Sequence, residues 1–406
     1  MKENSRIYLE IFLISLLIFL PKWICSYYFF PNEDLLIKTL LDIKDVHYFL
    51  NVISFSNFDL TPSFNEFIEA KKIITFPFFS IMIHSFFYKI IGYSSFIFLE
   101  LLFIFFSILI FFKILKKIEL NKAYSLLVVA IYFSLPFILN TLNIINLSQV
   151  SILQNLVSDF IGSRFPRPLV TNIFLLLGIY FLIKLQKELI EKRTPKSIIS
   201  ISVIMALQIN SFFYFFLIQG ISTIILLIIY KKKSLFKYIL NHNKLIIKSL
   251  FIGSIGLIIF LLQSFVGEGD YSNRMSVIFI DFSDKIFLIK YFFSNLLRTE
   301  VIIFIVISLS LFFYIKKTFN RKNNQINLFI IFIISSFLST IFFILLSSKI
   351  ISLYQFVNIF LFSFVLFIFI SIILIINNLK FLRNLLTKYR FLIYFFIFFL
   401  GIIFNS

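Results

Sequence analysis

Long apolar runs recur along the chain and are separated by short polar segments. The runs are continuous and do not alternate between apolar and polar positions, so the pattern favours helices over the strands of a membrane barrel. A helix rises about 1.5 Å per residue, and about 20 apolar residues therefore cross about 30 Å of hydrocarbon. The pattern predicts about eleven spanning helices, at 7–29, 93–112, 123–140, 168–186, 198–209, 212–230, 246–265, 299–315, 326–346, 354–376 and 391–404.

The interval 197–230 is long for one crossing and short for two, and both of its ends are basic. Polar side chains gather near its middle, at Gln208, Asn210 and Ser211. Lipid cannot satisfy polar groups, so such a break suits helices that face protein or water. We predict two short helices that are broken at this point.

The segment after the first span opens with an amphipathic pattern. Over residues 34–48, a spacing of 100° per residue places Asp34, Asp42 and Asp45 in one narrow stripe, and apolar side chains fill most of the remaining surface. A helix with this distribution lies along a membrane surface or against other helices, with its charged stripe toward water.

A second apolar element covers 75–92 and carries Pro77 and His84. If this element crossed the membrane, the basic segment 113–122 would fall on the outer side, which contradicts the charge pattern of the rest of the chain. We therefore predict a second interfacial helix at 75–92, and a first extracytoplasmic loop over 30–92.

The distribution of charge predicts the orientation of the chain. There are 38 Lys and Arg residues against 19 Asp and Glu, which gives a formal net charge of +19. Most of the basic residues lie on one side of the predicted spans, and most of the acids lie on the other. Cytoplasmic loops are enriched in Lys and Arg, so the N-terminus is predicted to be cytoplasmic. Because topology accounts for the positive charge, a nucleic-acid partner is not expected.

Composition agrees with a polytopic membrane protein. Hydrophobic residues make up 60% of the chain, and the mean hydropathy is +1.01, more apolar surface than a soluble core of this size can bury. The single cysteine, Cys25, offers neither an internal disulfide nor a zinc cluster. The sequence shows no repeat or linker, so we predict one all-α membrane domain over 1–406, with a second large extracytoplasmic loop at 266–298. The excess of Phe, Ile, Asn and Lys is typical of an AT-rich genome and indicates a bacterial inner membrane.

Three stretches near the N-terminus share a known layout: "NED" (32–34), "FPFFSIMIHSFFYKIIG" (76–92) and "KILKKI" (113–118). A first anchor is followed by an outer loop that opens with acids, an interfacial helix between a proline and a glycine, and a span that ends in basic residues. This layout resembles that of the GT-C membrane glycosyltransferases. The resemblance covers about the first 120 residues and, more generally, the number of spans.

Members of that family transfer a sugar from a polyprenyl-phosphate donor on the outer face of the membrane. The resemblance therefore implies three partners: a lipid-linked sugar donor, an acceptor that is a glycan, lipid or protein, and the surrounding membrane lipids. The acceptor hydroxyl needs a base, and a carboxylate near the membrane surface can take its proton. We predict Asp34 as this base, with Glu33 as the alternative. The residues alone leave open that these acids only form a solvated loop.

The motif "GSRFPRPLV" (162–170) places Arg164 and Arg167 at the outer end of a predicted span. A guanidinium offers two parallel hydrogen bonds to phosphate oxygens, so these arginines are candidates to bind the phosphate of the donor. Lys349, at the outer edge of another span, is a further candidate. The alternative is that the arginines only anchor the span at the interface.

Asp45 of the first outer loop, with Tyr271 and Arg274 of the second, is a candidate for an acceptor groove; the alternative for the second loop is a polar connector. The sequence contains no nucleotide-binding or nicotinamide motif and no clustered metal ligands, so no cofactor and no metal are expected. Glu100 lies inside the span 93–112, where a carboxylate costs about 2.5–3.5 kcal/mol on insertion scales. It is predicted to face the bundle in a structural role and to pair with Lys89 or an outer arginine.

Two other classes of protein compete with a glycosyltransferase. A polysaccharide polymerase or ligase also has many spans and outer arginines, but its large loop lies late in the chain, whereas the largest loop here is the first. A flippase or other transporter predicts polar residues at mid-membrane in related halves of the chain. Such residues are few here, apart from Glu100 and the break at 208–211.

Overall fold

The computed structural model describes residues 2–33, 46–59, 77–144, 151–165, 167–231, 235–266, 282–318, 326–346 and 350–405. Every regular element in these ranges is an α-helix. Among the described helices, nine are long and apolar enough to cross a membrane, and a bent pair of helices can supply a tenth span. The prediction of an all-α, multi-pass membrane protein is confirmed.

The predicted spans correspond closely to the observed helices. The runs predicted at 198–209 and 212–230 form one helix with a kink, and the run at 391–404 forms a helix too short to cross alone. This last helix, α18 (Arg390–Asn405), is bent by 63° from the helix before it, α17 (Lys380–Lys388). These two differences explain why about eleven predicted runs correspond to nine or ten candidate spans.

The chain separates into two compact units. Unit 1 draws on residues 1–68, 80–176 and 373–406, and unit 2 draws on 69–79 and 177–372. A single domain over 1–406 stays a prediction.

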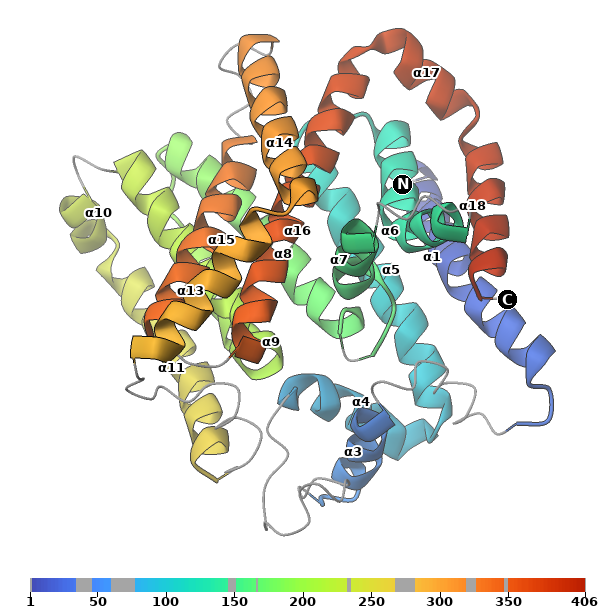
Figure 1. The fold of residues 1–406 in the computed structure, drawn as a ribbon, viewed down its shortest axis with the longest axis horizontal. Coiled ribbons are helices and arrows are strands. Elements are labelled where there is room, and N and C mark those ends of the chain that lie inside the picture. The colour runs from blue at the N-terminus through green and yellow to red at the C-terminus, as the bar shows by residue number, and fades with distance from the viewer. Residues whose placement is uncertain are drawn as a thin grey trace. The chain divides into compact units, whose positions relative to one another are not determined.

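Unit 1 contains α1, α18 and the helices of the first half of the chain (Figure 1). Its elements are α1 (Lys2–Phe29), α3 (Val46–Ser56), α4 (Phe78–Ile91), α5 (Ser94–Lys117), α6 (Lys122–Ile144), α7 (Ser151–Ile161), the start of α8 (Leu169–Ile190), the end of α16 (Ile350–Asn378), α17 and α18. The helix α4 lies within the predicted interfacial element 75–92. The proposed acidic helix at 34–48 falls mostly outside the described residues.

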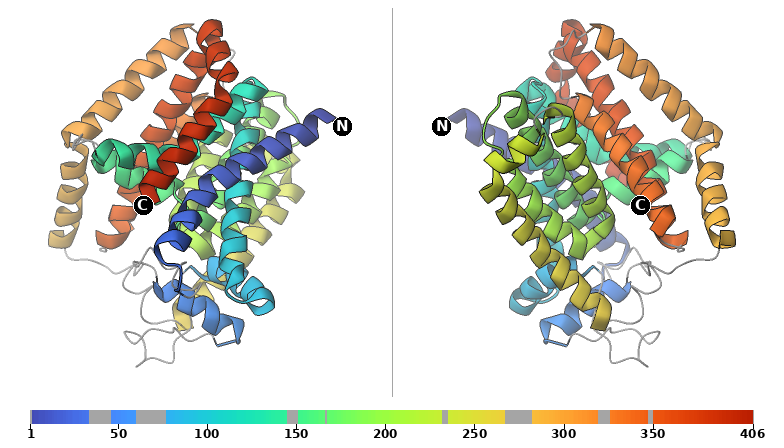
Figure 2. Two further views of the ribbon diagram at one scale, coloured as in Figure 1. Left: turned by 90° about the vertical axis from the view of Figure 1, so that its right-hand side faces the viewer. Right: turned by 90° about the vertical axis from the view of Figure 1, so that its left-hand side faces the viewer.

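The centre of unit 1 is formed by α1, α5, α6 and α18, and Figures 1 and 2 show α18 lying beside α1. At Gly401 of α18, an added Cβ would lie 2.7 Å from the Pro21 side chain of α1, so only glycine allows this approach. Farther along the same two helices, Arg390 Nε donates to Glu10 Oε1 at 2.9 Å, and the Tyr394 hydroxyl donates to the same oxygen at 3.0 Å. The helices α1 and α18, the first and last of the described helices, are thus joined by close packing and by a partly buried ion pair.

Unit 2 is built around α9, which packs against α11 and α15. Its elements are the end of α8, α9 (Ser197–Lys231), α10 (Leu235–Asn241), α11 (Asn243–Val266), α13 (Phe282–Leu296), α14 (Thr299–Thr318), α15 (Ile326–Leu346) and most of α16. The helix α13 lies within the segment 266–298, which was predicted as a loop. Apolar residues within α13 recur at a helical spacing.

The helix α9 is interrupted at Phe212, which has non-helical backbone angles (φ −153°, ψ 81°). The interruption follows directly after Gln208, Asn210 and Ser211, where the sequence predicted a break. All three polar side chains are buried, at 1% exposure or less. The predicted break is confirmed by the non-helical residue at this position, and the three polar side chains next to it face protein rather than lipid.

Candidate functional site

The connection between α7 and α8 carries a cluster of charged side chains. Arg164 Nη2 and Arg167 Nη2 lie 3.7 Å and 3.6 Å from Asp159 Oδ1, respectively. Arg164 Nε also donates a hydrogen bond to the Arg167 carbonyl oxygen at 3.0 Å. The two arginines predicted from the sequence therefore lie together, and because they share one carboxylate, the cluster has a net positive charge.

The local sequence explains how this turn forms. The Asn172 N–H donates to the Pro168 carbonyl at 2.7 Å, which starts the hydrogen-bond pattern of α8, and the Leu169 N–H donates to the Arg164 carbonyl at 3.1 Å. Proline suits this position because the first residues of a helix need no N–H partner within the helix. The arginines are thus held at the N-terminal end of α8, where exposed N–H groups and the helix dipole also favour an anion.

A partly buried ion pair joins α1 to α5. Lys22 Nζ lies 3.1 Å from both carboxylate oxygens of Glu100, and Trp23 Nε1–H donates to Glu100 Oε2 at 3.2 Å. Glu100 is only 5% exposed, so the prediction that it faces the bundle is confirmed. The predicted partners, Lys89 or an outer arginine, are wrong. The close packing of α1 against α5 brings Lys22 to the carboxylate instead.

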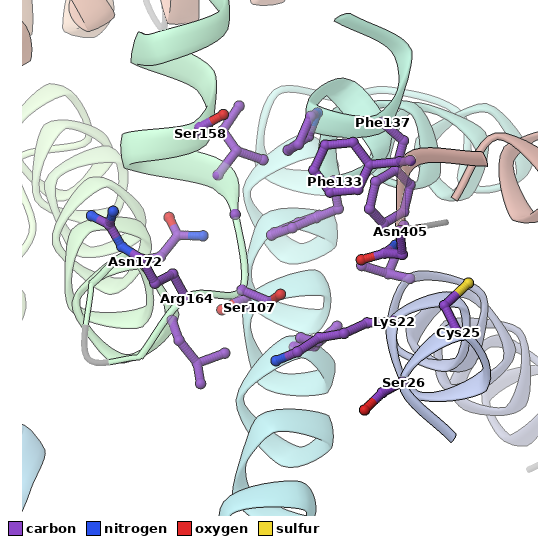
Figure 3. A pocket seen from close by; sticks show the side chains of 18 of the residues that line it. Lys22, Cys25, Ser26, Ser107, Phe133, Phe137, Ser158, Arg164, Asn172 and Asn405 are labelled. Atoms are coloured by element: carbon purple, nitrogen blue, oxygen red, sulfur yellow. The ribbon is translucent and has the colours of Figure 1, made fainter. Parts of the chain in front are cut away.

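A cavity of about 480 Å³ opens between α1, α5, α6, α18 and the α7–α8 connection, all within unit 1 (Figure 3). Lys22 extends from α1 toward the side of the cavity that Arg164 and Asn172 form. Phe133 and Phe137 of α6 provide part of its apolar wall. Among the described residues, the cationic side chains in the lining are Lys22 and Arg164, and no carboxylate lines the cavity.

Both cations of the cavity are supported from outside it. Asp159 forms an ion pair with Arg164, and Glu100 forms one with Lys22. Neither carboxylate lines the cavity. With Arg167 included, the five side chains carry three positive and two negative charges. The cavity therefore combines an excess of positive charge with a mostly apolar wall, which suits an amphiphilic anion.

Asn172 is a functional candidate that the sequence reasoning missed. Its side chain is 4% exposed and lines the cavity, and its Oδ1 accepts no hydrogen bond from the described residues. A buried amide oxygen without a donor costs about 1–3 kcal/mol, so a donor on a bound molecule would relieve this cost. The available signal was the pair Thr171-Asn172, which is polar within an apolar run.

His84 of α4 packs against Phe165 in the α7–α8 connection. It is 1% exposed, its Nδ1 lies 3.0 Å from the Ser80 carbonyl oxygen, and its ring centroid lies 4.1 Å from that of Phe165. Burial lowers the pKa of His84 to about 3, so the ring is neutral at physiological pH. A space of about 30 Å³ beside it is also lined by Glu100 and Arg164, and it is large enough for a water molecule.

The other predicted site residues are distributed as follows. Glu33 is described and exposed, and its N–H lies 3.4 Å from the carbonyl oxygen of Phe30, a residue that lines the cavity. The predicted base and the remaining phosphate and acceptor candidates lie outside the described residues; these are Asp34, Asp45, Tyr271, Arg274 and Lys349. Of the predicted phosphate-binding residues, Arg164 lines the cavity, whereas Arg167 is not among its lining residues.

The polar break of α9 in unit 2 has a structural explanation. Asn210 Nδ2 donates to the carbonyl oxygens of Ala206 and Gly256, both at 3.0 Å, and Gln219 Nε2 donates to that of Gly178 at 3.2 Å. These amides thus connect α9 to α11 and to α8 where glycines allow the helices to approach. They serve packing, which weakens the argument for a transport pathway at this break.

Comparison of the chain with known protein families, with characterised proteins and with solved structures finds no match.

Proposed function

We propose that this protein is a membrane glycosyltransferase that uses a polyprenyl-phosphate sugar, and that the cavity of unit 1 binds the phosphate and the first part of the lipid. One observation carries the proposal: the lining combines Arg164 and Lys22 with apolar walls and, among the described residues, contains no carboxylate. A lipid-linked phosphate has the matching chemistry, because an anionic head is attached to a hydrocarbon chain.

The charges support a role in the leaving-group step. When the acceptor oxygen attacks the anomeric carbon, the bond from that carbon to the phosphate oxygen breaks, and negative charge develops on the departing polyprenyl phosphate. Cations that are already in position stabilise this charge without reorganisation. Arg164 offers a bidentate contact and Lys22 offers a point charge, while Asp159 and Glu100 hold them in place.

The proton of the acceptor hydroxyl passes to the predicted base, Asp34, with Glu33 as the alternative. Asp34 follows Phe30, at the edge of the cavity, by four positions. An extended chain spans at most about 3.6 Å per residue, so this distance along the chain is compatible with action at the cavity mouth. The resemblance to GT-C enzymes further implies inversion at the anomeric carbon.

Cys25 provides a direct test of binding. It is the only cysteine of the chain, and it lines the cavity. Methyl methanethiosulfonate labelling of the purified protein, followed by intact mass spectrometry, is expected to slow in the presence of undecaprenyl phosphate but not undecaprenol. Ser107→Cys in a Cys25→Ser background gives a second reporter in the same cavity. If neither reporter is protected, the cavity does not bind the donor.

Two further measurements separate the classes of function. Release of polyprenyl phosphate from a panel of polyprenyl-phosphate sugars, measured by chromatography and mass spectrometry, is expected for a transferase. Protection of Cys25 by undecaprenyl diphosphate alone would instead favour the polymerase or ligase alternative. Protection by undecaprenyl phosphate without turnover of any donor would contradict the assignment as an enzyme of this class.

A further inference from the structure

The main cavity of unit 1 is also lined by neutral polar side chains. They come from α1, α5, α7, the α7–α8 connection, α8 and α18, and they are Ser26, Ser107, Ser158, Ser163, Asn172 and Asn405. A hydrocarbon chain forms no hydrogen bond with such groups, and the charge of a phosphate is met by the cations Lys22 and Arg164. The cavity therefore carries more hydrogen-bonding groups than an anionic head and a lipid chain require.

Asn172 is the most informative of these side chains. It is 4% exposed, and its Oδ1 accepts no hydrogen bond from the described residues. Figure 3 shows it beside Arg164, on the side of the cavity opposite Asn405. Buried polar atoms normally have a partner, so the Asn172 oxygen lacks a donor at the wall of the cavity. The torsion that sets the plane of the amide is broad, and the oxygen can therefore turn toward a donor in the cavity.

The chemistry of the missing donor is restricted. The amide oxygen can only accept a hydrogen bond. The phosphate of a polyprenyl-phosphate sugar is a diester, which carries no O–H group at neutral pH, and the prenyl chain has no polar hydrogen. The remaining part of the donor lipid is the sugar, and its hydroxyl or acylamino groups supply the O–H or N–H that the Asn172 oxygen lacks.

The dimensions of the cavity agree with this assignment. Its volume of about 480 Å³ falls within the range of about 300–1,000 Å³ that is typical of sites for small molecules, and exceeds what a phosphate alone needs. In the donor, the sugar is bonded directly to the phosphate. A phosphate on Arg164 therefore brings the sugar ring to the neighbouring Asn172.

We propose that Asn172 recognises the sugar of the donor, by accepting a hydrogen bond at Oδ1 from a sugar hydroxyl or acylamino N–H. This inference rests on the proposed function, because it assigns the sugar of that same donor to one residue of the cavity. Arg164 and Lys22 bind any lipid phosphate, whereas Asn172 distinguishes a lipid phosphate that carries a sugar from one that does not.

The test measures how strongly different lipids protect Cys25 of the full-length purified protein from methyl methanethiosulfonate. Undecaprenyl methyl phosphate has the charge and the chain of the donor but no sugar. Undecaprenyl phosphates of glucose, mannose, galactose and N-acetylglucosamine supply the sugar. At least one of these four is expected to protect at about tenfold lower concentration than the methyl ester, which is the size of effect expected from one hydrogen bond.

Asn172→Leu is expected to abolish this preference and to leave protection by the methyl ester as in the parent. Asn172→Ala removes the same amide without adding bulk and should behave alike. Thr171 provides the matched control, because it is 2% exposed, donates to the Pro168 carbonyl oxygen at 3.4 Å and does not line the cavity. Thr171→Val should keep the preference for the sugar.

The possible outcomes separate this inference from the proposed function. Equal protection by the methyl ester and all four sugar lipids would overturn the inference alone. The same holds if both Asn172 variants keep the preference, if Thr171→Val loses it to the same extent, or if the Asn172 variants weaken the methyl ester as much as the sugar lipids, which would place the amide on the phosphate. Absence of protection by every lipid would overturn the proposed function, and this inference with it.

Discussion

Lys22 Nζ lies 3.1 Å from both carboxylate oxygens of Glu100, and the same lysine lines the main cavity of unit 1. The pair joins residues that are 78 positions apart in the sequence. Lys22 therefore offsets the free-energy cost of burying the Glu100 carboxylate. Glu100 in turn holds the Lys22 ammonium group at the cavity wall. This relationship connects the stability of the bundle to the chemistry of its proposed site.

The ion pair can be tested by a double-mutant cycle. Lys22→Met and Glu100→Gln are each expected to cost about 1–3 kcal/mol, because each leaves the remaining partner without its hydrogen bonds in a poorly solvated place. The double variant should cost less than the sum of the two, by at least about 0.5 kcal/mol. The measurement is reversible unfolding of the purified protein in mixed micelles. Additive costs would show that the pair is not coupled.

Arg164 is expected to be the more important of the two arginines for donor binding. Arg164→Lys keeps the charge but loses the bidentate contact, so the KM for the lipid-linked sugar should rise, by about tenfold. Arg167→Lys should have a smaller effect, because Arg167, unlike Arg164, does not line the cavity. Arg193, which is 73% exposed and pairs with Glu191, supplies the control Arg193→Lys. Unchanged kinetics in both Arg164 and Arg167 variants would leave them only an anchoring role.

Asp34→Asn tests the predicted base. The amide keeps the size of the side chain but cannot take a proton, so the rate of transfer is expected to fall about 10²–10⁴-fold while donor binding persists. Asp42→Asn and Glu33→Gln should have much smaller effects. If Glu33→Gln alone abolishes transfer, the role of base belongs to Glu33. Full activity of Asp34→Asn would remove Asp34 from the mechanism.

The contact between α9 and α11 depends on a glycine. An added Cβ at Gly256 would lie 2.6 Å from the Cα of Ala206, so Gly256→Ala must displace one helix and is expected to destabilise by about 1–3 kcal/mol. Gly253, one turn earlier, has no atom within 4 Å of an added Cβ. Gly253→Ala is the matched control and should be neutral or slightly stabilising. Equal thermal stabilities for the two variants would contradict this packing.

Burial of His84 predicts a dependence of stability on pH. The pKa of His84 is lowered to about 3 in the folded protein from 6.5, because burial disfavours the charged ring. The unfolded chain therefore binds a proton that the folded chain refuses, and stability falls as the pH drops from about 6.5 toward 3. The contribution is at most about 1.4 kcal/mol per pH unit. His84→Asn, which can still donate to Ser80, should show a flatter profile of Tm against pH between 7 and 4.5; an identical slope would exclude His84 as the cause.

The sequence by itself determined the positions of the membrane spans and the break in α9. The length of an apolar run and the presence of polar residues within it are local properties, and the hydrocarbon core imposes one length on every crossing helix. For the same reason α15 begins and ends where its apolar run does, at 326 and 346. Arg164 and Arg167 could be identified as candidates because arginine is scarce among the predicted outer segments.

Only the tertiary structure decided which of these residues meet. The partner of Glu100 on α5 is Lys22 on α1. The sequence did not identify this pair, because helix periodicity does not specify which helices pack together. In the sequence, Asn172 is one of two adjacent polar residues in an apolar run, and only the fold places its side chain in the cavity lining with Arg164. Packing between helices depends on side-chain shapes and on close approaches such as Gly401 against Pro21, which are set by pairs of residues distant in the chain.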